Sequence, residues 1–551
     1  MRRAGFFYFA ICLLWFPSVF LNFSSSLAGI PGDNYLFVWH NWWLAHSLFV
    51  GRSPFFTKAV FFPEGISLGT HTLSLLNSIP GAFLSFFLNP VQTYNLQWLL
   101  TFVLSSTAMY AVAFDASGAR LGSLLAGFVF GFSYFRLSHG LGHLNLLSTY
   151  FLPAVVLFAH RYFVGGGKKN FVLLVGSVVL TGYGDWYHLV AALIITIVIW
   201  ALQLSRWPGI IRDRRCIVAI ATSLVFLLPI LIPLFQNMRA ATLVLEKPGP
   251  DNSADLWAIF VPNFHPFLAG RERILAFFAA NPYERSVYLG WVSFGFALCG
   301  WFHAPKRWAR LGGILILFGF ALAVGPAVYW KGSAIVSSPW TPYALLSNFV
   351  PGVIHFRAPS RFLILTFLGM CLLIPFGIQE IQTWMANHLK SDAVTKGALG
   401  VLLGLAALEL YPGDYPMTPH RLPAIYQTIA RDKEKFAVAE FPLHSGMFFP
   451  KYPGWQDRIF QYYQVYHGKP LLCGYTARAD LTAIGFLETF MRSSLDGTLD
   501  AAWFERQKIR FALFHVDRLE PQTYARYWGN LSRWGREVPS GDPAIRALQF
   551  Y

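Results

Sequence analysis

The chain is organised around the segment that follows its first hydrophobic run, which reads Gly32-Asp33-Asn34-Tyr35, then Trp39-His40-Asn41-Trp42-Trp43, with Pro63-Glu64-Gly65 and His71 further on. An acidic residue just past a membrane-length run is costly unless it faces a water-filled site. Tryptophan concentrates at membrane–water interfaces, so we expect Trp39 to Trp43 to hold this loop at headgroup depth. Asp33 is therefore the leading candidate for a functional residue.

Composition indicates the class of protein. Of 551 residues, 55% are hydrophobic, 17% aromatic and only 13% charged, and the mean hydropathy is +0.46. These values indicate a polytopic α-helical membrane protein, with the lipid bilayer as its first partner. The net charge of +16 comes largely from basic residues in short loops between apolar runs. Such residues orient a membrane protein, so nucleic acid is not expected as a partner.

Hydrophobic runs predict about 11 to 12 transmembrane helices. Residues 73–90 are the uncertain run, because Pro80-Gly81 interrupts them and they could cross the membrane or form a re-entrant or interfacial segment. Basic loops, including the cluster from Arg206 to Arg215, place the N-terminus and those loops in the cytoplasm. The other expected spans are 5–28, 95–114, 121–138, 145–163, 170–183, 186–204, 216–235, 287–303, 311–330, 361–382 and 397–412.

The composition changes after Pro412. Residues 413–551 hold 17 basic and 14 acidic residues, against 26 and 13 in the longer part before them, so the polarity there is that of a soluble domain. We predict a transmembrane domain over 1–412 and a small α/β domain over 413–551, which an odd number of spans places outside the cytoplasm. Short β-type runs at 436–441, 470–473 and 509–516 alternate with helical stretches such as 498–508.

Asp185 and His188 lie where two apolar runs meet, in the sequence Gly182-Tyr183-Gly184-Asp185-Trp186-Tyr187-His188. A carboxylate and an imidazole three residues apart share one helix face and suit metal binding or proton relay. The aromatic and glycine neighbours suit a tight interfacial turn equally well. Both interpretations stay open.

A second pair is formed by His139 and His143. The two residues are four apart, so both imidazoles lie on one face if the segment is helical. Gly140 and Gly142 favour a loop instead, and no glutamate accompanies the pair as the zinc-peptidase motif requires. Metal binding, substrate contact and simple interfacial polarity are the alternatives.

Asp255 lies in the long outer loop predicted between residues 236 and 285. It is a further substrate or metal candidate, and its competing role is to cap a helix.

Two arginines, Arg357 and Arg361, lie at the predicted outer mouth of a span. Guanidinium groups bind phosphate through paired hydrogen bonds, so both residues are candidates for phosphate binding. Arginines at a membrane surface also extend their charged ends into water without any ligand, which is the alternative.

This layout resembles that of the GT-C membrane glycosyltransferases, of the bacterial multi-pass type that depends on polyprenyl-phosphate sugars. The resemblance covers residues 1–412 in architecture, and its local motif is the acidic first outer loop, here Gly32-Asp33-Asn34. Many members carry an acidic pair where this chain has Asp33-Asn34. The resemblance implies a multi-pass protein of the bacterial cytoplasmic (inner) membrane with an extracytoplasmic soluble domain after the last span.

The implied activity is that of a hexosyl or pentosyl transferase. A sugar would pass from a polyprenyl-phosphate-linked donor to a glycan or lipid acceptor of the cell envelope on the outer face. Asp33 would be the catalytic base, and Arg357 and Arg361 would stabilise the departing phosphate. A divalent metal ion is compatible with the other candidates, but the sequence assigns no cofactor. A transporter or flippase of lipid-linked sugars and a non-catalytic envelope-assembly subunit are the alternatives.

Overall fold

The computed structural model describes the chain except for residues 205–213, 241–249, 269, 280, 338–339, 350–352, 354–355, 390, 444–456 and 477–480. The predicted basic cluster from Arg206 to Arg215 therefore lies mostly outside the described residues. Two compact units make up the chain. Unit 1 comprises Met1–Asn22, Asn95–Leu228 and Leu245–Met417, and unit 2 comprises Phe23–Tyr94, Pro229–Val244 and Thr418–Tyr551. The domain boundary predicted between residues 412 and 413 stays a prediction.

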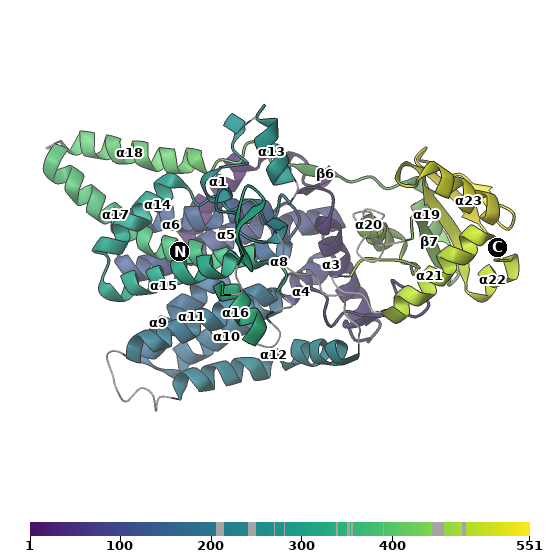
Figure 1. Ribbon diagram of the computed structural model, residues 1–551, viewed down its shortest axis with the longest axis horizontal. Coiled ribbons are helices and arrows are strands. Elements are labelled where there is room, and N and C mark those ends of the chain that lie inside the picture. Colours follow the sequence, from purple (N-terminus) through teal and green to yellow (C-terminus); the bar gives the residue numbers. More distant parts are fainter. Residues whose placement is uncertain are drawn as a thin grey trace. The chain divides into compact units, whose positions relative to one another are not determined.

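Unit 1 is mostly helical (Figure 1). Its helices are α1 (Arg2–Trp15), α2 (Pro17–Leu21), α6 (Arg120–Gly131), α7 (Tyr134–His139), α8 (Leu144–Leu147), α9 (Phe151–Gly165), α10 (Lys168–Gly184), α11 (Trp186–Leu204), α13 (Glu272–Ala279), α14 (Trp291–His303), α15 (Lys306–Ala323), α16 (Pro342–Phe349), the 3-10 helix η6 (Pro359–Phe362), α17 (Leu363–Leu389) and α18 (Asp392–Glu409). A hairpin of β4 (Ala327–Trp330) and β5 (Ser333–Ser337) follows α15. Helices α5 (Pro90–Ser117) and α12 (Arg215–Ala240) each contain a boundary between the units.

Six stretches of the described chain are long and apolar enough to cross a membrane. They are Pro90–Ser117, Arg120–His139, Leu144–Gly165, Trp186–Gln203, Arg215–Met238 and Pro359–Leu389. The larger number expected from hydropathy stays a prediction. Several of the remaining runs form helices that are shorter, such as α14 with 13 residues, or that have charged ends, such as α15, which begins at Lys306-Arg307.

Three of the predicted runs have different boundaries in the structure. The first, 5–28, is broken because Pro17 has no N–H to continue α1; the chain restarts there as α2, and Ser26–Ala28 form strand β1. The end of the run 311–330 forms β4. Within 73–90, only Leu75–Leu84 form a helix, α4. Ten residues span about 15 Å, half of a bilayer core of about 30 Å, so the interpretation of 73–90 as a full span is wrong.

Helix α17 lies at the centre of unit 1 and packs against α6, α14 and α15. Its packing against α14 depends on glycine. A Cβ at Gly300 would lie 2.1 Å from the carbonyl oxygen of Leu373, and one at Gly377 would lie 2.0 Å from that of Phe296. Small residues allow membrane helices to bring their backbones together, which explains the close approach.

Unit 2 combines a mixed sheet with helices from both ends of the chain (Figure 1). Its helices are α3 (Asp33–Phe49), α4, α19 (Ala424–Arg431), α20 (Asp457–His467), α21 (Leu481–Asp496), α22 (Ala501–Arg506) and α23 (Pro521–Leu531). Its strands are β1, β2 (Phe56–Thr57), β3 (Ile66–Ser67), β7 (Ala437–Phe441), β8 (Ile509–His515), β9 (Arg536–Val538) and β10 (Ile545–Gln549), and β6 (Met417–Pro419) lies at the boundary.

The sheet has the order β7-β8-β10-β9, with β7 parallel to β8 and the other neighbours antiparallel. All five residues of β7 are buried. The β-type runs predicted at 436–441 and 509–516 correspond to β7 and β8, and α22 lies within the helical stretch predicted at 498–508. The run 470–473 contributes only a bridge between Leu471 and Val438.

Candidate functional site

Asp33 is the first residue of α3, and its side chain is 21% exposed. Its Oδ1 lies 2.6 Å from Nε of Arg458, a residue of α20 in the same unit. The guanidinium also lies over the ring of Tyr475, 3.9 Å from its centre. An acidic side chain in the first turn of a helix meets the positive end of the helix dipole. Both features stabilise a negative charge at Asp33 while leaving the carboxylate within reach of solvent.

Asn34 fixes the start of α3. Its Oδ1 accepts hydrogen bonds from the backbone N–H groups of Gly32 and Tyr35, at 3.1 and 2.9 Å. Its Nδ2 donates to Oγ1 of Thr418 at 3.1 Å. Asn34 is fully buried, so in the motif Asp33-Asn34 only the aspartate can meet a ligand.

His40 and His71 are a buried pair in the same unit. Their Nε2 atoms lie 2.7 Å apart, so one ring donates a hydrogen bond to the other. Burial lowers the pKa of His71 to about 4 and the pKa of His40 well below its ordinary value, and in both cases the charge of Asp33 opposes the change. Both rings are therefore neutral at pH 7 and within electrostatic reach of Asp33.

The tryptophans of α3 pack inside unit 2. Trp39 and Trp43 are buried, with their rings stacked at a centroid distance of 5.9 Å. Nε1 of Trp39 donates to Oε1 of Gln464, a residue of α20, at 2.7 Å. Nε1 of Trp43 donates to the backbone carbonyl of Pro54 at 2.9 Å. The prediction that these two residues hold the loop at headgroup depth is therefore wrong, because both are buried within the protein, where Trp39 fastens α3 to α20.

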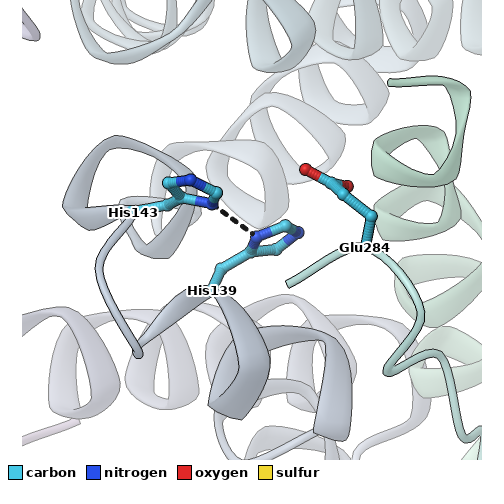
Figure 2. A group of neighbouring side chains, drawn as sticks. All are labelled: His139, His143 and Glu284. Atoms are coloured by element: carbon cyan, nitrogen blue, oxygen red, sulfur yellow. Dashed lines mark hydrogen bonds between the residues drawn. The ribbon is translucent and has the colours of Figure 1, made fainter. Parts of the chain in front are cut away.

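A second polar cluster lies in unit 1 and contains His139, His143 and Glu284 (Figure 2). Helix α7 ends at His139, and the backbone N–H of His143 donates to the carbonyl of His139 at 2.7 Å. This turn brings the two Nδ1 atoms to 3.2 Å, although the two residues do not share a helix. Glu284 comes from the segment between α13 and α14, and one ligand atom from each of the three residues lies within 4.8 Å of the others.

Glu284 is held by two neighbouring residues of η6. Its Oε1 accepts from Nε and Nη2 of Arg361 at 2.7 and 2.6 Å, and its Oε2 accepts from the hydroxyl of Ser360 at 2.6 Å. Burial raises the pKa of the Glu284 carboxyl, but Arg361 and then His139 outweigh this effect and bring the pKa to about 2. Glu284 is therefore a carboxylate at physiological pH.

Local sequence explains how the histidine turn is built. The fully buried Arg136 of α7 donates hydrogen bonds to the carbonyls of Gly131, Thr101 and Leu147, and so ties both sides of the turn together. Gly140 is needed because a Cβ there would lie 2.5 Å from the hydroxyl oxygen of Tyr415. The two glycines that favour a loop in the sequence thus belong to a compact turn that presents both imidazoles.

Asp185 and His188 do not join this cluster as ligands. Oδ1 of Asp185 accepts from the N–H of Tyr187 at 2.7 Å and caps α11, while Oδ2 accepts from Nδ2 of Asn145 at 2.6 Å. His188 is fully buried, and within the described residues its ring nitrogens have no hydrogen-bond partner. The structure thus gives Asp185 a structural task, and a metal or substrate role for either residue stays a prediction.

Asp255 supports the β4–β5 hairpin of unit 1. It is fully buried and accepts hydrogen bonds from the backbone N–H groups of Trp257, Lys331 and Gly332 at 2.9, 3.1 and 2.8 Å. Lys331 and Gly332 have φ angles of 51° and 80°, as in the tight turns that join antiparallel strands. The carboxylate therefore satisfies the donors of the turn, and its predicted substrate or metal role stays a prediction.

The two arginines predicted to bind phosphate have different surroundings. Arg361 is engaged by Glu284 and also lies over the ring of Tyr187, 5.0 Å from its centre. Arg357 is half-buried. Arg361 belongs to the cluster of unit 1, and phosphate binding by either arginine stays a prediction.

The two clusters differ in their chemistry. In unit 2, a carboxylate beside a guanidinium can accept a proton or orient a hydroxyl group. In unit 1, two imidazoles and a carboxylate are ligands of the kind that bind first-row transition metals. Sequence reasoning missed Arg458 and Glu284. Glu284 could have been found, since it is another acidic residue in an outer loop next to an apolar run, as Asp33 is.

The chain matches no protein-family model and no curated protein sequence. Among solved structures it is similar to the arabinofuranosyltransferase AftD from mycobacteria, with a TM-score of 0.56 and 14% identity over 100% of this chain and 42% of that chain. The oligosaccharyltransferase of Archaeoglobus fulgidus gives a TM-score of 0.44 at 10% identity, over 97% of this chain and 71% of that chain. ArnT from Cupriavidus metallidurans gives 0.43 at 12%, over 99% and 97%.

This chain spans less than half the length of the AftD chain it matches. AftD is a membrane glycosyltransferase of the GT-C superfamily, so the GT-C-like fold predicted from the sequence is confirmed.

Proposed function

We propose that this chain is a membrane glycosyltransferase of the bacterial cytoplasmic membrane. In this proposal it transfers a hexosyl or pentosyl group from a polyprenyl-phosphate-linked donor to a glycan or lipid acceptor on the outer face. The observation that carries the proposal is a solvent-accessible carboxylate, Asp33, at the start of α3, in a chain with the fold of AftD.

In the proposed reaction, the acceptor hydroxyl oxygen forms a bond to the anomeric carbon of the sugar. The bond from that carbon to the phosphate oxygen breaks, and the lipid phosphate leaves with the electron pair. Asp33 takes the proton of the hydroxyl. Its ion pair with Arg458 makes the carboxylate a weaker base, so we expect the proton to move late, when the hydroxyl has already become acidic through bonding to the sugar.

The role of the arginines of unit 1 remains part of the proposal. We keep Arg357 as a residue that binds the donor phosphate. For Arg361 the ion pair with Glu284 favours a positioning role, because its guanidinium already has an anionic partner.

The proposal is tested in membranes that contain the full chain and a labelled polyprenyl-phosphate sugar. Wild-type chain should form a glycosylated acceptor, and Asp33→Asn should form it about a hundred- to ten-thousand-fold more slowly, although it is present at the same level. Asp392→Asn is the matched control, because Asp392 is an exposed carboxylate that pairs with Lys396 on its own helix. Movement of the label across the bilayer without formation of a glycosidic bond would identify a transporter and contradict the proposal.

A further inference from the structure

We propose that His139, His143 and Glu284 form a binding site for a divalent first-row transition metal ion, with Zn²⁺ as the reference ion. The proposal does not depend on glycosyl transfer, because it concerns the binding of the ion itself. It rests on three side chains that converge from two separate segments of unit 1 (Figure 2).

The spacing of the ligand atoms is the first argument. One ligand atom of each residue lies within 4.8 Å of the others. Ligands at the usual distances from a tetrahedral Zn²⁺ ion lie about 3.4 Å apart. The Nδ1 atoms of His139 and His143 are already 3.2 Å apart, so side-chain rotations suffice to gather the set around an ion.

The surroundings of Glu284 are the second argument. Carboxylates that bind metals are themselves held by hydrogen bonds, which fix their direction. Arg361 and Ser360 provide these bonds, and Glu284 is only 3% exposed. The neighbouring residue, Tyr283, packs its ring against that of His143 at a centroid distance of 4.2 Å. The carboxylate and the second imidazole are therefore positioned by the same short segment.

Charge and access are the third argument. The charges of Glu284 and Arg361 cancel, so a bound divalent ion would keep its positive charge and attract an anionic or polar oxygen ligand. Three protein ligands leave at least one coordination position for such a ligand, which is the arrangement of catalytic rather than structural zinc sites. His143 is half-buried, whereas His139 and Glu284 are buried, so an ion can enter from the side of His143.

The test uses the full chain, purified in detergent and treated with a chelator. Dialysis against Zn²⁺ and against Co²⁺ should leave one ion per chain, measured by elemental analysis, and the Co²⁺ form should show the visible absorption of a site with nitrogen and oxygen ligands. His139→Gln and His143→Gln should each weaken binding by at least about tenfold. His388→Ala is the control, because His388 is an exposed imidazole elsewhere in unit 1, so this variant should bind as wild type does.

Circular dichroism and gel filtration report whether each variant is folded. If His139→Gln does not fold, His143→Gln decides, because its half-buried position tolerates substitution better. The proposal is overturned if the wild-type chain retains no ion, or if folded His143→Gln binds Zn²⁺ with wild-type affinity.

Discussion

Arg361 and Glu284 form an ion pair that cannot be predicted from the local sequence around either residue. In the sequence, Arg361 is a cation at the mouth of a span and Glu284 is one acidic residue of a long loop. In the structure they form a buried ion pair, with Ser360 as a further partner of the carboxylate. The chemistry of each residue follows from the other, and their distance in the chain hides that relation from sequence patterns.

The ion pair leads to a prediction about stability. Removing one partner of a buried pair leaves the other charge uncompensated, which costs about 3 to 5 kcal/mol. Arg361→Gln should therefore lower the free energy of unfolding by about that amount, measured by denaturant titration in detergent. Arg310→Gln, at an exposed position of α15, should cost much less. Equal stability of the two variants would show that the Glu284–Arg361 pair contributes nothing special.

The Glu284–Arg361 pair also predicts how the stability of the folded protein depends on pH. The pKa of Glu284 falls from an ordinary value of 4.5 to about 2 on folding, so the folded state binds the proton less strongly. The stabilisation is complete above pH 4.5 and is lost as the pH falls towards 2. Glu284→Gln should have a lower melting temperature than wild type at pH 6, and the difference should shrink as acid is added.

At the scale of elements, the sequence predicts most positions but not all boundaries. Long apolar runs such as 186–204 and 216–235 correspond to α11 and α12 because length and hydropathy are properties of the run alone. The break at Pro17 was readable as well, since proline cannot continue a helix, but the run around it was apolar enough to suggest one span. The burial of Trp39 depends on α20, and no local pattern contains that information.

Helix packing in unit 1 gives a prediction for α14. Gly300→Ala should destabilise the chain by about 1 to 3 kcal/mol, because the added Cβ would lie 2.1 Å from the carbonyl oxygen of Leu373. Gly295→Ala in the same helix is the matched control, since Gly295 has open space at its Cβ position. It should be neutral or slightly stabilising, because alanine favours a helix more than glycine does. Thermal unfolding in detergent measures both, and similar effects would mean that α14 and α17 are not closely packed at Gly300.

At the scale of the whole molecule, the sequence allowed us to predict the fold and to select Asp33 as the leading candidate. It did not allow us to predict that Asp33 pairs with Arg458. Composition and the apolar runs indicate a polytopic helical membrane protein, and the GT-C-like fold was expected from the resemblance of the layout and of Gly32-Asp33-Asn34 to that family. Asp33 stands out because an acid beside a membrane span is rare. Arg458 belongs to a different part of the sequence, and only the fold brings it to Asp33. Likewise, the four-residue spacing of His139 and His143 is visible in the sequence, but only the fold brings Glu284 to these two residues.

Membrane orientation is a further prediction at this scale. Basic loops favour the cytoplasmic side, so the region near residue 210, outside the described residues, should be cytoplasmic, and the region near residue 430 should be outside. Reporter fusions at these two places, one active only in the cytoplasm and the other only outside, should give opposite signals. Matching signals would refute the predicted orientation and the outer-face location of the proposed reaction.

The central claim is that Asp33 acts as a base in glycosyl transfer, and the turnover of Asp33→Asn tests it most directly. Asparagine keeps the size of the side chain but cannot accept a proton at neutral pH. Turnover with a polyprenyl-phosphate sugar should fall by about a hundred- to ten-thousand-fold, while the variant stays folded and binds the donor with wild-type affinity. Turnover at the wild-type rate would contradict the claim and leave Asp33 with the structural task of pairing with Arg458 at the start of α3.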